Sequence, residues 1–450
     1  MLSEARNRSL TEVGPGTPMG ALLRRYWQPI AAVTELADNP IKPVRLLGED
    51  LVLYRDLSGQ YGLVERHCPH RSADLSYGIL EPCGLRCSYH GWLFDHTGAC
   101  REQPFEDVAA PEARFRDQIR IAAYKIQALA GLLWAYLGPE PAPLLPNWEP
   151  FTWANGFTQI VFSTVPCNWF QCQENSIDPV HFEWMHDNWG SRLAGRNTPY
   201  APRHLKLAFD EFDYGLVYRR VREGSDESSP LWTVGRVCLW PNALFTGNHF
   251  EWRVPIDDTA TLSVGWFFTR VPQDREPYVQ DSIPYWHAPV TDPNTGRWIT
   301  SHIMNQDFVG WVGQGAVTDR GREHLGRSDR GIVMLRQRFF QDLETIAGGG
   351  EPKAIIRDPA QNRCIALPIV GRRQLTEGVT RAEVEASGPR GVEVPRRDFP
   401  YLTGQPASIR QAYNAAMGFD ADNPAPVSAD TATRRAADPT PPHSRPPATG

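Results

Sequence analysis

No stretch of this 450-residue sequence approaches the eighteen or more uninterrupted apolar residues that a membrane-spanning helix needs. The first nine residues lack the apolar core of a secretory signal, which argues against export. Basic residues are not in excess, because the formal net charge is −6, so neither nucleic acid nor an anionic membrane is indicated as a partner. A Gly-x-Gly-x-x-Gly dinucleotide fingerprint is also missing, so any nicotinamide cofactor would be bound by a separate protein. These absences together predict a cytoplasmic protein.

Eight cysteines are present, enough in principle for four disulfides. A long chain without an export signal belongs in a reducing compartment, where disulfides are rare. The cysteines therefore favour metal ligation or inert burial over a disulfide framework.

Short apolar runs divide the chain into regions of different character. Between residues 44 and 138 they alternate with turns, which is typical of a small all-β module. Beyond residue 151, strand-like runs at 216–218 and 261–266 precede helical spacing over 330–347, so this part is predicted to be α+β. The predicted organisation is an N-terminal arm (1–43), an all-β domain (44–138), a Pro-rich linker (139–150), an α+β domain (151–404) and a C-terminal segment (405–450), predicted to be largely disordered and rich in Ala, Pro and Thr after residue 420.

Two cysteine–histidine pairs lie within the all-β module. Cys68-Pro69-His70 is followed, after sixteen intervening residues, by Cys87-Ser88-Tyr89-His90. Each half supplies one thiolate and one imidazole, and a Rieske [2Fe–2S] cluster needs two thiolates on one iron and two imidazoles on the other. A zinc site could use the same atoms, but zinc motifs usually place two cysteines in one half and two histidines in the other. Cys68, His70, Cys87 and His90 are therefore the predicted ligands of a Rieske cluster.

A second group of potential metal ligands follows about a hundred residues later. Residues 174–186 read Glu-Asn-Ser-Ile-Asp-Pro-Val-His-Phe-Glu-Trp-Met-His and contain two histidines, His181 and His186, close to an acid. Two histidines and one carboxylate on one face of Fe(II) leave positions open for dioxygen and substrate. Asp178-Pro179 has the signature of a helix start, with Asp as N-cap and Pro as the first helical residue.

The spacing of these two histidines is unusual for a shared metal. Residues five apart differ by about 140° around a regular helix. Both imidazoles can reach one ion only if the helix is distorted, for instance by a π-bulge. The alternative is a buried amphipathic helix whose histidines satisfy polar contacts in the core.

The segment from His67 to Asp95 resembles the Rieske domain of bacterial ring-hydroxylating oxygenases. Over about residues 10–400 the chain is similar to the large (alpha) subunits of the phthalate 4,5-dioxygenase type, notably in the stretch 305–336. The resemblance implies that the Rieske domain is followed by a catalytic domain with an antiparallel sheet and helices, of the helix-grip, START-like class. It also implies a head-to-tail homotrimer, a heterologous ring closed by threefold rotation.

Roles for individual residues follow from the same resemblance. It makes His181 and His186 ligands of a mononuclear Fe(II) and Asp307 the third ligand. Without it, Asp319 or Glu323 would compete with Asp307 almost evenly. Asp178 would hydrogen-bond His181 and, across a subunit boundary, a Rieske histidine, for which His90 is the choice. The resemblance also places Asn175 in the lining of the same site. Asp319, Arg320, Glu323 and Asp329 are instead predicted to have a structural role, as a partly buried ion-pair network outside the site.

The implied activity is that of a terminal oxygenase in aromatic-compound catabolism. A reductase with flavin and a plant-type [2Fe–2S] cluster would take electrons from NAD(P)H and pass them through the Rieske cluster to the mononuclear iron, where O₂ is activated beside an aromatic, carboxylated substrate. Ring dihydroxylation and O-demethylation of a methoxylated aromatic acid remain open, as does a plain electron-transfer Rieske protein without oxygenase activity. Four arginines could bind a substrate carboxylate, although each is more commonly structural: Arg192, Arg196, Arg236 and Arg253.

Overall fold

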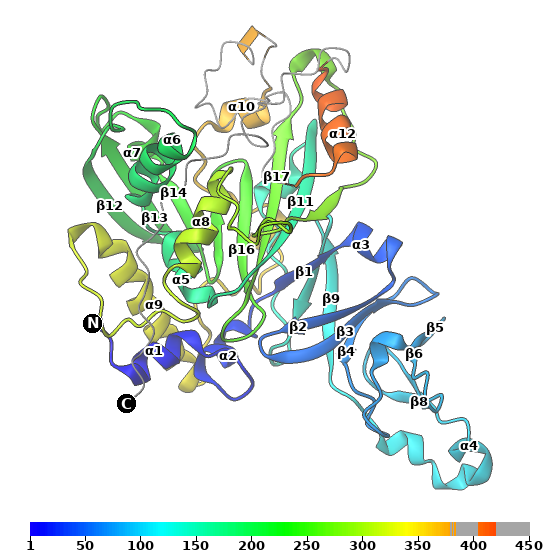
Figure 1. Ribbon diagram of the computed structural model, residues 1–450. Helices are drawn as coiled ribbons and strands as arrows, with labels where there is room; N and C mark the ends of the chain where they lie inside the picture. The colour runs from blue at the N-terminus through cyan, green and yellow to red at the C-terminus, as the bar shows by residue number, and fades with distance from the viewer. Residues whose placement is uncertain (379, 381, 384–403, 420–450) are drawn as a thin grey trace.

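The computed structural model describes residues 1–378, 380, 382–383 and 404–419. Figure 1 shows two parts, an N-terminal region of small sheets and a larger region built on one long sheet with helices on its surfaces. Among the described residues, no helix combines the length and the apolar character needed to cross a membrane. The architecture is mixed α and β, which confirms the predicted fold class.

The N-terminal region contains an antiparallel six-stranded sheet in the order β1-β10-β9-β4-β3-β2. Its strands are β1 (Gln28–Ala32), β2 (Ile41–Leu46), β3 (Glu49–Arg55), β4 (Tyr61–Glu65), β9 (Ala123–Leu129) and β10 (Leu132–Tyr136). Strand β1 lies inside the segment predicted as an N-terminal arm. Because it pairs with β10 and its residues are buried, this part of the segment belongs to the sheet. The other elements of that segment are α1 (Glu4–Thr11), α2 (Pro18–Leu23) and α3 (Val33–Asp38).

A smaller sheet extends from the first, in the order β5-β6-β7-β8. Its strands are β5 (Ile79–Glu81), β6 (Gly84–Arg86), β7 (Leu93–Phe94) and β8 (Cys100–Glu102), followed by α4 (Glu106–Ala109). A separate apolar cluster fills this part of the molecule and includes Cys68, Leu85, Cys87 and Phe94. The two cysteines are therefore tied to a packed core, although their loops reach the surface.

An eight-stranded sheet forms the centre of the larger region, in the order β12-β13-β14-β15-β16-β17-β11-β18. All neighbouring strands are antiparallel except β11 and β18, which run parallel. The strands are β11 (Gly156–Val165), β12 (His204–Phe212), β13 (Gly215–Arg222), β14 (Arg236–Leu239), β15 (Ala243–Phe245), β16 (His249–Pro255), β17 (Thr261–Arg270) and β18 (Tyr285–His287). Strand β17 includes the predicted run 261–266, and β13 includes 216–218.

Helices cover this sheet and carry the candidate iron ligands. They are α5 (Trp169–Asn175), the π-helix η5 (Phe182–Trp189), α6 (Gly190–Leu193), α7 (Pro230–Thr233), α8 (Ile303–Val312), α9 (Arg330–Ala347), α10 (Arg372–Thr376) and α12 (Ala407–Met417). The helix over 330–347 agrees with its predicted bounds and packs Phe339 against Trp169 and Phe170. Helix α12 buries Ile409 and Tyr413 in a core cluster, so the C-terminal segment begins with an ordered helix, whereas residues 420–450 lie outside the described part.

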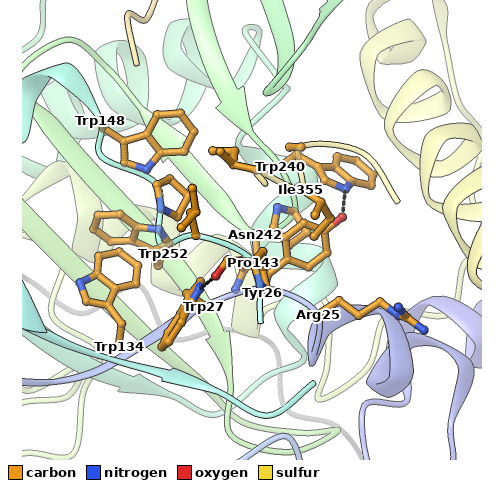
Figure 2. A pocket seen from close by; sticks show the side chains of 15 residues that line it. Arg25, Tyr26, Trp27, Trp134, Pro143, Trp148, Trp240, Asn242, Trp252 and Ile355 are labelled. Carbon is orange, nitrogen blue, oxygen red and sulfur yellow. Dashed lines mark hydrogen bonds between the residues drawn. The ribbon is translucent and has the colours of Figure 1, made fainter. Parts of the chain in front are cut away.

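Aromatic side chains join the two regions at a small cavity of about 40 Å³ (Figure 2). Trp134 of β10 contacts Trp252 of β16 edge to face, with ring centroids 5.1 Å apart. Trp27 donates its indole N–H to the Pro143 carbonyl at 2.9 Å, which holds the linker against the N-terminal sheet. The cavity has room for only a few water molecules, and no candidate metal ligand lines it. Its role is therefore structural, as the seam between the two regions.

Candidate metal centres

Two loops of similar construction present the cysteine–histidine pairs. The backbone N–H of Cys68 donates to the Ala73 carbonyl at 2.8 Å, and that of Cys87 donates to the Trp92 carbonyl at 2.8 Å. Each cysteine carbonyl also accepts a hydrogen bond from within its own loop, at 2.9 and 3.0 Å. Gly91 has φ +78°, which a residue with a side chain adopts only with strain. Each loop therefore begins at a fixed cysteine and carries a histidine at its tip.

The four side chains are arranged as a cluster with an inner and an outer half. Cys68 and Cys87 are 1% and 2% exposed, whereas His70 and His90 are exposed at the surface. The two imidazole rings lie 4.4 Å apart between centroids, and that of His70 stacks on Trp92 at 4.6 Å. Burial raises the pKa of the Cys68 thiol to about 12, so a thiolate there needs a metal to stabilise it. Buried thiolates beside exposed imidazoles fit a Rieske cluster whose histidine-bound iron faces outward.

The spacing of these four residues also bears on the zinc alternative. Ligand atoms around one tetrahedral zinc lie within about 4 Å of one another. In the described part of the chain, one group of three or more metal-binding side chains has all its ligand atoms within 4.8 Å, and it does not include these residues. Their wider spacing favours a cluster of two irons over a single zinc ion.

The group that meets this distance criterion consists of His181, His186 and Asp307. Both histidines belong to a distorted helix, in which Phe182–Trp189 forms a π-helix between His181 and α6. A π-helix is wider than an α-helix, so residues five apart lie close to one face. The predicted helix distortion is confirmed, and it removes the angular difficulty that an α-helix would impose. A turn precedes the helix, in which Asp178 Oδ1 accepts the Val180 N–H at 2.8 Å.

Asp307 projects from helix α8 towards both imidazoles. Its Oδ1 lies 3.6 Å from His181 Nε2 and 3.3 Å from His186 Nε2. Ligand atoms in neighbouring positions of an octahedral ion are about 3 Å apart, because each bond is about 2.1 Å. Buried His186 Nε2 makes no hydrogen bond in the described structure, so it is free to coordinate a metal. The donor set of two imidazoles and one carboxylate therefore fits a mononuclear Fe(II).

The electrostatics of this site favour a bound cation. Burial tends to raise the pKa of Asp307, but His186 and His181 more than offset it and hold this pKa below its usual value. Burial alone would lower the pKa of His186, yet Asp307 raises it above the ordinary value. Asn175, at the end of α5, donates its amide to Asp307 Oδ1 at 3.3 Å. The structure thus brings Asn175 into contact with the carboxylate of the group.

Asp178 lies beside this group rather than in it. Its Oδ2 is 3.5 Å from His181 Nδ1, a contact longer than an ordinary hydrogen bond. Asp178, His181 and Asn175 line a cavity of about 190 Å³ that opens to the surface. Asp178 and His181 are therefore both accessible from the same open cavity.

Sequence reasoning overlooked Gln306, the residue immediately before Asp307. Its Oε1 lies 3.1 Å from His186 Nδ1, and its Nε2 donates to the Thr300 carbonyl at 3.2 Å. The carbonyl oxygen accepts from the Nδ1–H tautomer, which leaves His186 Nε2 unprotonated and aimed towards Asp307. The only signal for Gln306 in the sequence was its position next to the candidate ligand Asp307. The folded structure is needed to identify His186 as its partner.

Replacing Gln306 with leucine should weaken iron binding about 10–100-fold, because outer partners of metal-bound histidines contribute at this level. The measurement is a titration of Fe(II) into the iron-depleted protein with its Rieske cluster intact. Gln341→Leu, on the exposed face of α9, is the matched control. Equal iron affinity in the two variants would contradict this role for Gln306.

A buried ion-pair network supports α5 behind the candidate iron site. Glu174 accepts from Arg320 Nη2 at 2.6 Å and from Arg336 Nε at 2.6 Å, and Arg336 also pairs with Glu323 at 2.7 Å. Arg320 and Glu323 therefore take part in the network predicted for them. Asp319 and Asp329 instead accept backbone N–H groups of Gly321 and Gly326.

Glu174→Ala should destabilise the fold by about 3–5 kcal/mol, because the buried guanidinium of Arg320 loses its acidic partner and that of Arg336 keeps only Glu323. Burial opposes ionisation of Glu174, but the two arginines hold its pKa below the ordinary value. This stability is therefore present at neutral pH and is lost as the pH falls through the folded-state pKa. Denaturant unfolding measures the change, with Glu351→Ala as control, because its pair with Arg357 is exposed and contributes at most about 1 kcal/mol. A loss for Glu174→Ala no larger than for the control would argue against the network's role.

Comparison with known proteins gives three results. The family model for the Rieske [2Fe-2S] domain matches residues 26–117. The 5,5'-dehydrodivanillate O-demethylase oxygenase subunit of Sphingobium sp. is 60% identical over 429 residues, covering 95% of this chain and 100% of the relative. The phthalate 4,5-dioxygenase oxygenase subunit of Pseudomonas putida is 30% identical, covering 79% of this chain and 90% of the relative.

Among solved structures, NdmA with caffeine, from Pseudomonas putida CBB5, superimposes with a TM-score of 0.54. It is 20% identical, and the match covers 77% of this chain and 94% of that chain. At this identity the likeness concerns the fold alone. The start of the family match at residue 26 agrees with the inclusion of strand β1 in the N-terminal sheet.

Proposed function

This chain belongs to the Rieske non-haem iron oxygenases as a terminal oxygenase subunit, and we propose that it is an O-demethylase of methoxylated aromatic acids. As an oxygenase it uses a Rieske cluster, a mononuclear iron and NAD(P)H electrons delivered by a separate protein. One observation carries the finer proposal: 60% identity over the whole length of a 5,5'-dehydrodivanillate O-demethylase subunit, against 30–40% for the ring dioxygenase subunits. The proposed substrate class is therefore a methoxylated, carboxylated biaryl or its single-ring equivalent.

The residues proposed to hold the two iron centres belong to the two cysteine loops, to the π-helix with the residue before it, and to α8. Cys68, His70, Cys87 and His90 would bind the cluster, and the mononuclear iron would be bound by His181, His186 and Asp307. When bound, that iron supplies the activation of O₂ next to the substrate. Gln306 fixes the tautomer of His186, and Asn175 fixes the carboxylate of Asp307.

Electron delivery between the centres is proposed to cross a subunit boundary. In Figure 1 the strands β5, β6 and β8 lie at the end of the small sheets away from the large sheet, while α5 and α8 lie beside β16 of the large sheet and α6 lies farther out. One chain thus keeps its two candidate centres apart. A homotrimer would bring His90 of one subunit to the cavity at Asp178 of the next, and Asp178 would bridge His90 and His181. The donor to the cluster would be a reductase with flavin and a plant-type [2Fe–2S] centre.

The proposed reaction converts an aryl methyl ether, O₂, two electrons and two protons into a phenol, formaldehyde and water. One oxygen atom enters the methyl group, whose C–O bond to the ring oxygen then breaks, and the other atom leaves as water. The two electrons come from NAD(P)H one at a time through the cluster. The chain's own contribution would be to orient the methoxy group towards the iron that His181, His186 and Asp307 would hold, and to keep bulk water away from it.

A single-turnover experiment tests this function without the native reductase. The iron-loaded protein is reduced chemically, the reductant is removed, and 5,5'-dehydrodivanillate and O₂ are added. The expected result is formaldehyde in equal amount to the phenol formed, with a product that has lost one methyl group. Protein lacking the mononuclear iron is the control, because it keeps the cluster but has no site for oxygen activation.

The same experiment with phthalate distinguishes ring dihydroxylation. A cis-dihydrodiol from phthalate, together with no formaldehyde from the methoxylated acid, would replace the proposed demethylase with a dioxygenase. If O₂ oxidises the cluster and neither substrate changes, the protein would be an electron-transfer Rieske protein without oxygenase activity.

A further inference from the structure

Two arginines on the large sheet have no acidic partner in the described part of the chain. Arg220 lies on β13 and Arg236 on β14, and Tyr218 of β13 is the cross-strand neighbour of Arg236. Tyr218 and Arg220 are two residues apart on one strand, so all three side chains leave the same face of the sheet. This face also carries His249, Glu251 and Arg253 of β16, as the strand register shows.

A single aromatic ring separates the two arginines from the candidate iron ligands. The guanidinium carbons of Arg220 and Arg236 lie 4.7 and 5.3 Å from the centroid of the Phe182 ring. The centroid of that ring is 4.4 Å from that of His181 and 5.2 Å from that of His186. The positive charges therefore lie about one aromatic ring away from the place where the metal would bind.

The other arginines around the site are neutralised by acids. Arg222 pairs with Asp187 at 2.8 Å, and Arg253 pairs with Glu251 at 3.0 Å and stacks on Trp311. Burial lowers the pKa of Arg220, and Asp187 offsets this only in part, because its ion pair is with Arg222. Of the four arginines considered from the sequence, Arg192 and Arg196 are exposed and Arg253 is paired, which leaves Arg236.

Arg220 and its neighbours have unused hydrogen-bonding capacity. Arg220 is 6% exposed, and its hydrogen bonding within the described residues consists of a long contact of 3.4 Å from Nη1 to the Pro179 carbonyl. The Nε atoms of Arg220 and Arg236 and the hydroxyl of Tyr218 are buried without partners there. Burial and the neighbouring Arg236 lower the pKa of Arg220 to about 10, partly opposed by Tyr218. Two unpaired guanidinium groups side by side are unfavourable unless an anion joins them.

We propose that Arg220 and Arg236, assisted by the Tyr218 hydroxyl, bind the carboxylate of the aromatic acid. This contact would determine how far the aromatic ring lies from the iron. This inference rests on the proposed function, whose substrate class it assigns to particular side chains. Guanidinium groups bind carboxylates through paired N–H donors in one plane, which fixes direction as well as distance. An acid held at this end would extend its ring past Phe182 towards the histidines, with a ring substituent near the place where the metal would bind. Arg220 and Arg236 are thus specificity-determining residues.

A purely structural role would have a different signature. Both arginines stack on Phe182, and this contact could serve only to hold the π-helix. Stacking does not require the free Nε hydrogens or the Tyr218 hydroxyl, and it does not depend on the charge of the substrate. The charge of the ligand therefore separates the two roles.

The test is anaerobic binding to the iron-loaded protein, with 5,5'-dehydrodivanillate and its uncharged diamide as probes. Arg220→Gln and Arg236→Gln should each raise the Kd of the acid about 10–100-fold, because each removes charged hydrogen bonds. The Kd of the diamide should change less than about threefold, because no carboxylate is present. Arg236→Lys keeps the positive charge and should restore part of the affinity for the acid. Arg219→Gln is the matched control on β13, since Arg219 points to the other face and pairs with Asp210.

The outcomes separate this inference from the proposed function. Equal losses for acid and diamide, or no loss for either, would overturn the carboxylate site and leave only the contact with Phe182. Charge-dependent binding by a protein that forms no formaldehyde would reject the demethylase function and keep the carboxylate site. Normal formaldehyde yield from Arg236→Gln and Arg220→Gln with an unchanged KM for the acid would reject the carboxylate site alone.

Discussion

Replacing His181 with alanine should remove the mononuclear iron and abolish substrate-dependent oxygen consumption while the Rieske cluster stays in place. His181 contributes one of the two imidazoles that converge on Asp307, and two remaining ligands bind Fe(II) too weakly to keep it loaded. Iron analysis should fall from about three to about two ions per chain. The electron paramagnetic resonance signal of the reduced cluster should be retained, because His181→Ala changes none of the four predicted cluster ligands, Cys68, His70, Cys87 and His90.

The control for this variant is His96→Ala, which removes an exposed histidine outside both candidate sites. It should keep the full iron content and full oxygen uptake. Full turnover by His181→Ala with a loaded cluster would refute the proposed ligand set. Loss of the cluster signal in that variant would instead show that the two centres do not fold independently.

Replacing Asp178 with asparagine should leave both iron centres bound but slow electron transfer between them. Asn keeps an oxygen that can accept the Val180 N–H, so the turn before the π-helix is retained. It removes the negative charge 3.5 Å from His181 Nδ1, which we propose as the link to a cluster histidine of the neighbouring subunit. Steady-state turnover should fall about 10–100-fold, the range observed when outer partners of metal-bound histidines are removed.

Freeze-quench spectroscopy of the pre-reduced protein measures this directly, because it follows cluster oxidation after substrate and O₂ are added. Asp213→Asn, an exposed position on the turn between β12 and β13, serves as control. An unchanged rate of cluster oxidation in Asp178→Asn would end the bridging proposal. A lost mononuclear iron would mean that Asp178 acts on metal binding instead.

The local parts of both centres could be predicted from the sequence because their ligands lie close together along the chain. The two loops that begin at Cys68 and Cys87 carry their cysteine and histidine within three or four positions, so spacing alone indicated the cluster type. The five-residue interval between His181 and His186 demanded a distorted helix, and the structure has a π-helix there. The number of residues between two such ligands is the same in any fold. It can therefore be read from the sequence without knowledge of the tertiary structure.

Contacts between distant parts of the chain could not be obtained in this way. Asp307 rested on family resemblance, since Asp319 and Glu323 competed with it, and only the placement of α8 beside the π-helix brings its carboxylate to the histidines. Gln306 was overlooked because its partner, His186, is more than a hundred residues away in the sequence. Arg220 was overlooked because it contacts Phe182, which belongs to a different element.

The sequence by itself determined the type of each candidate metal centre and the class of helix that the second one needs. The tertiary structure decided which carboxylate meets the two histidines, which arginines lack an acidic partner among the described residues, and that strand β1 and helix α12 belong to the packed core. The physical reason is the range of the interactions. Ligand spacing and helix distortion depend on neighbours along the chain, whereas charge pairing and burial depend on which surfaces the eight-stranded sheet brings together.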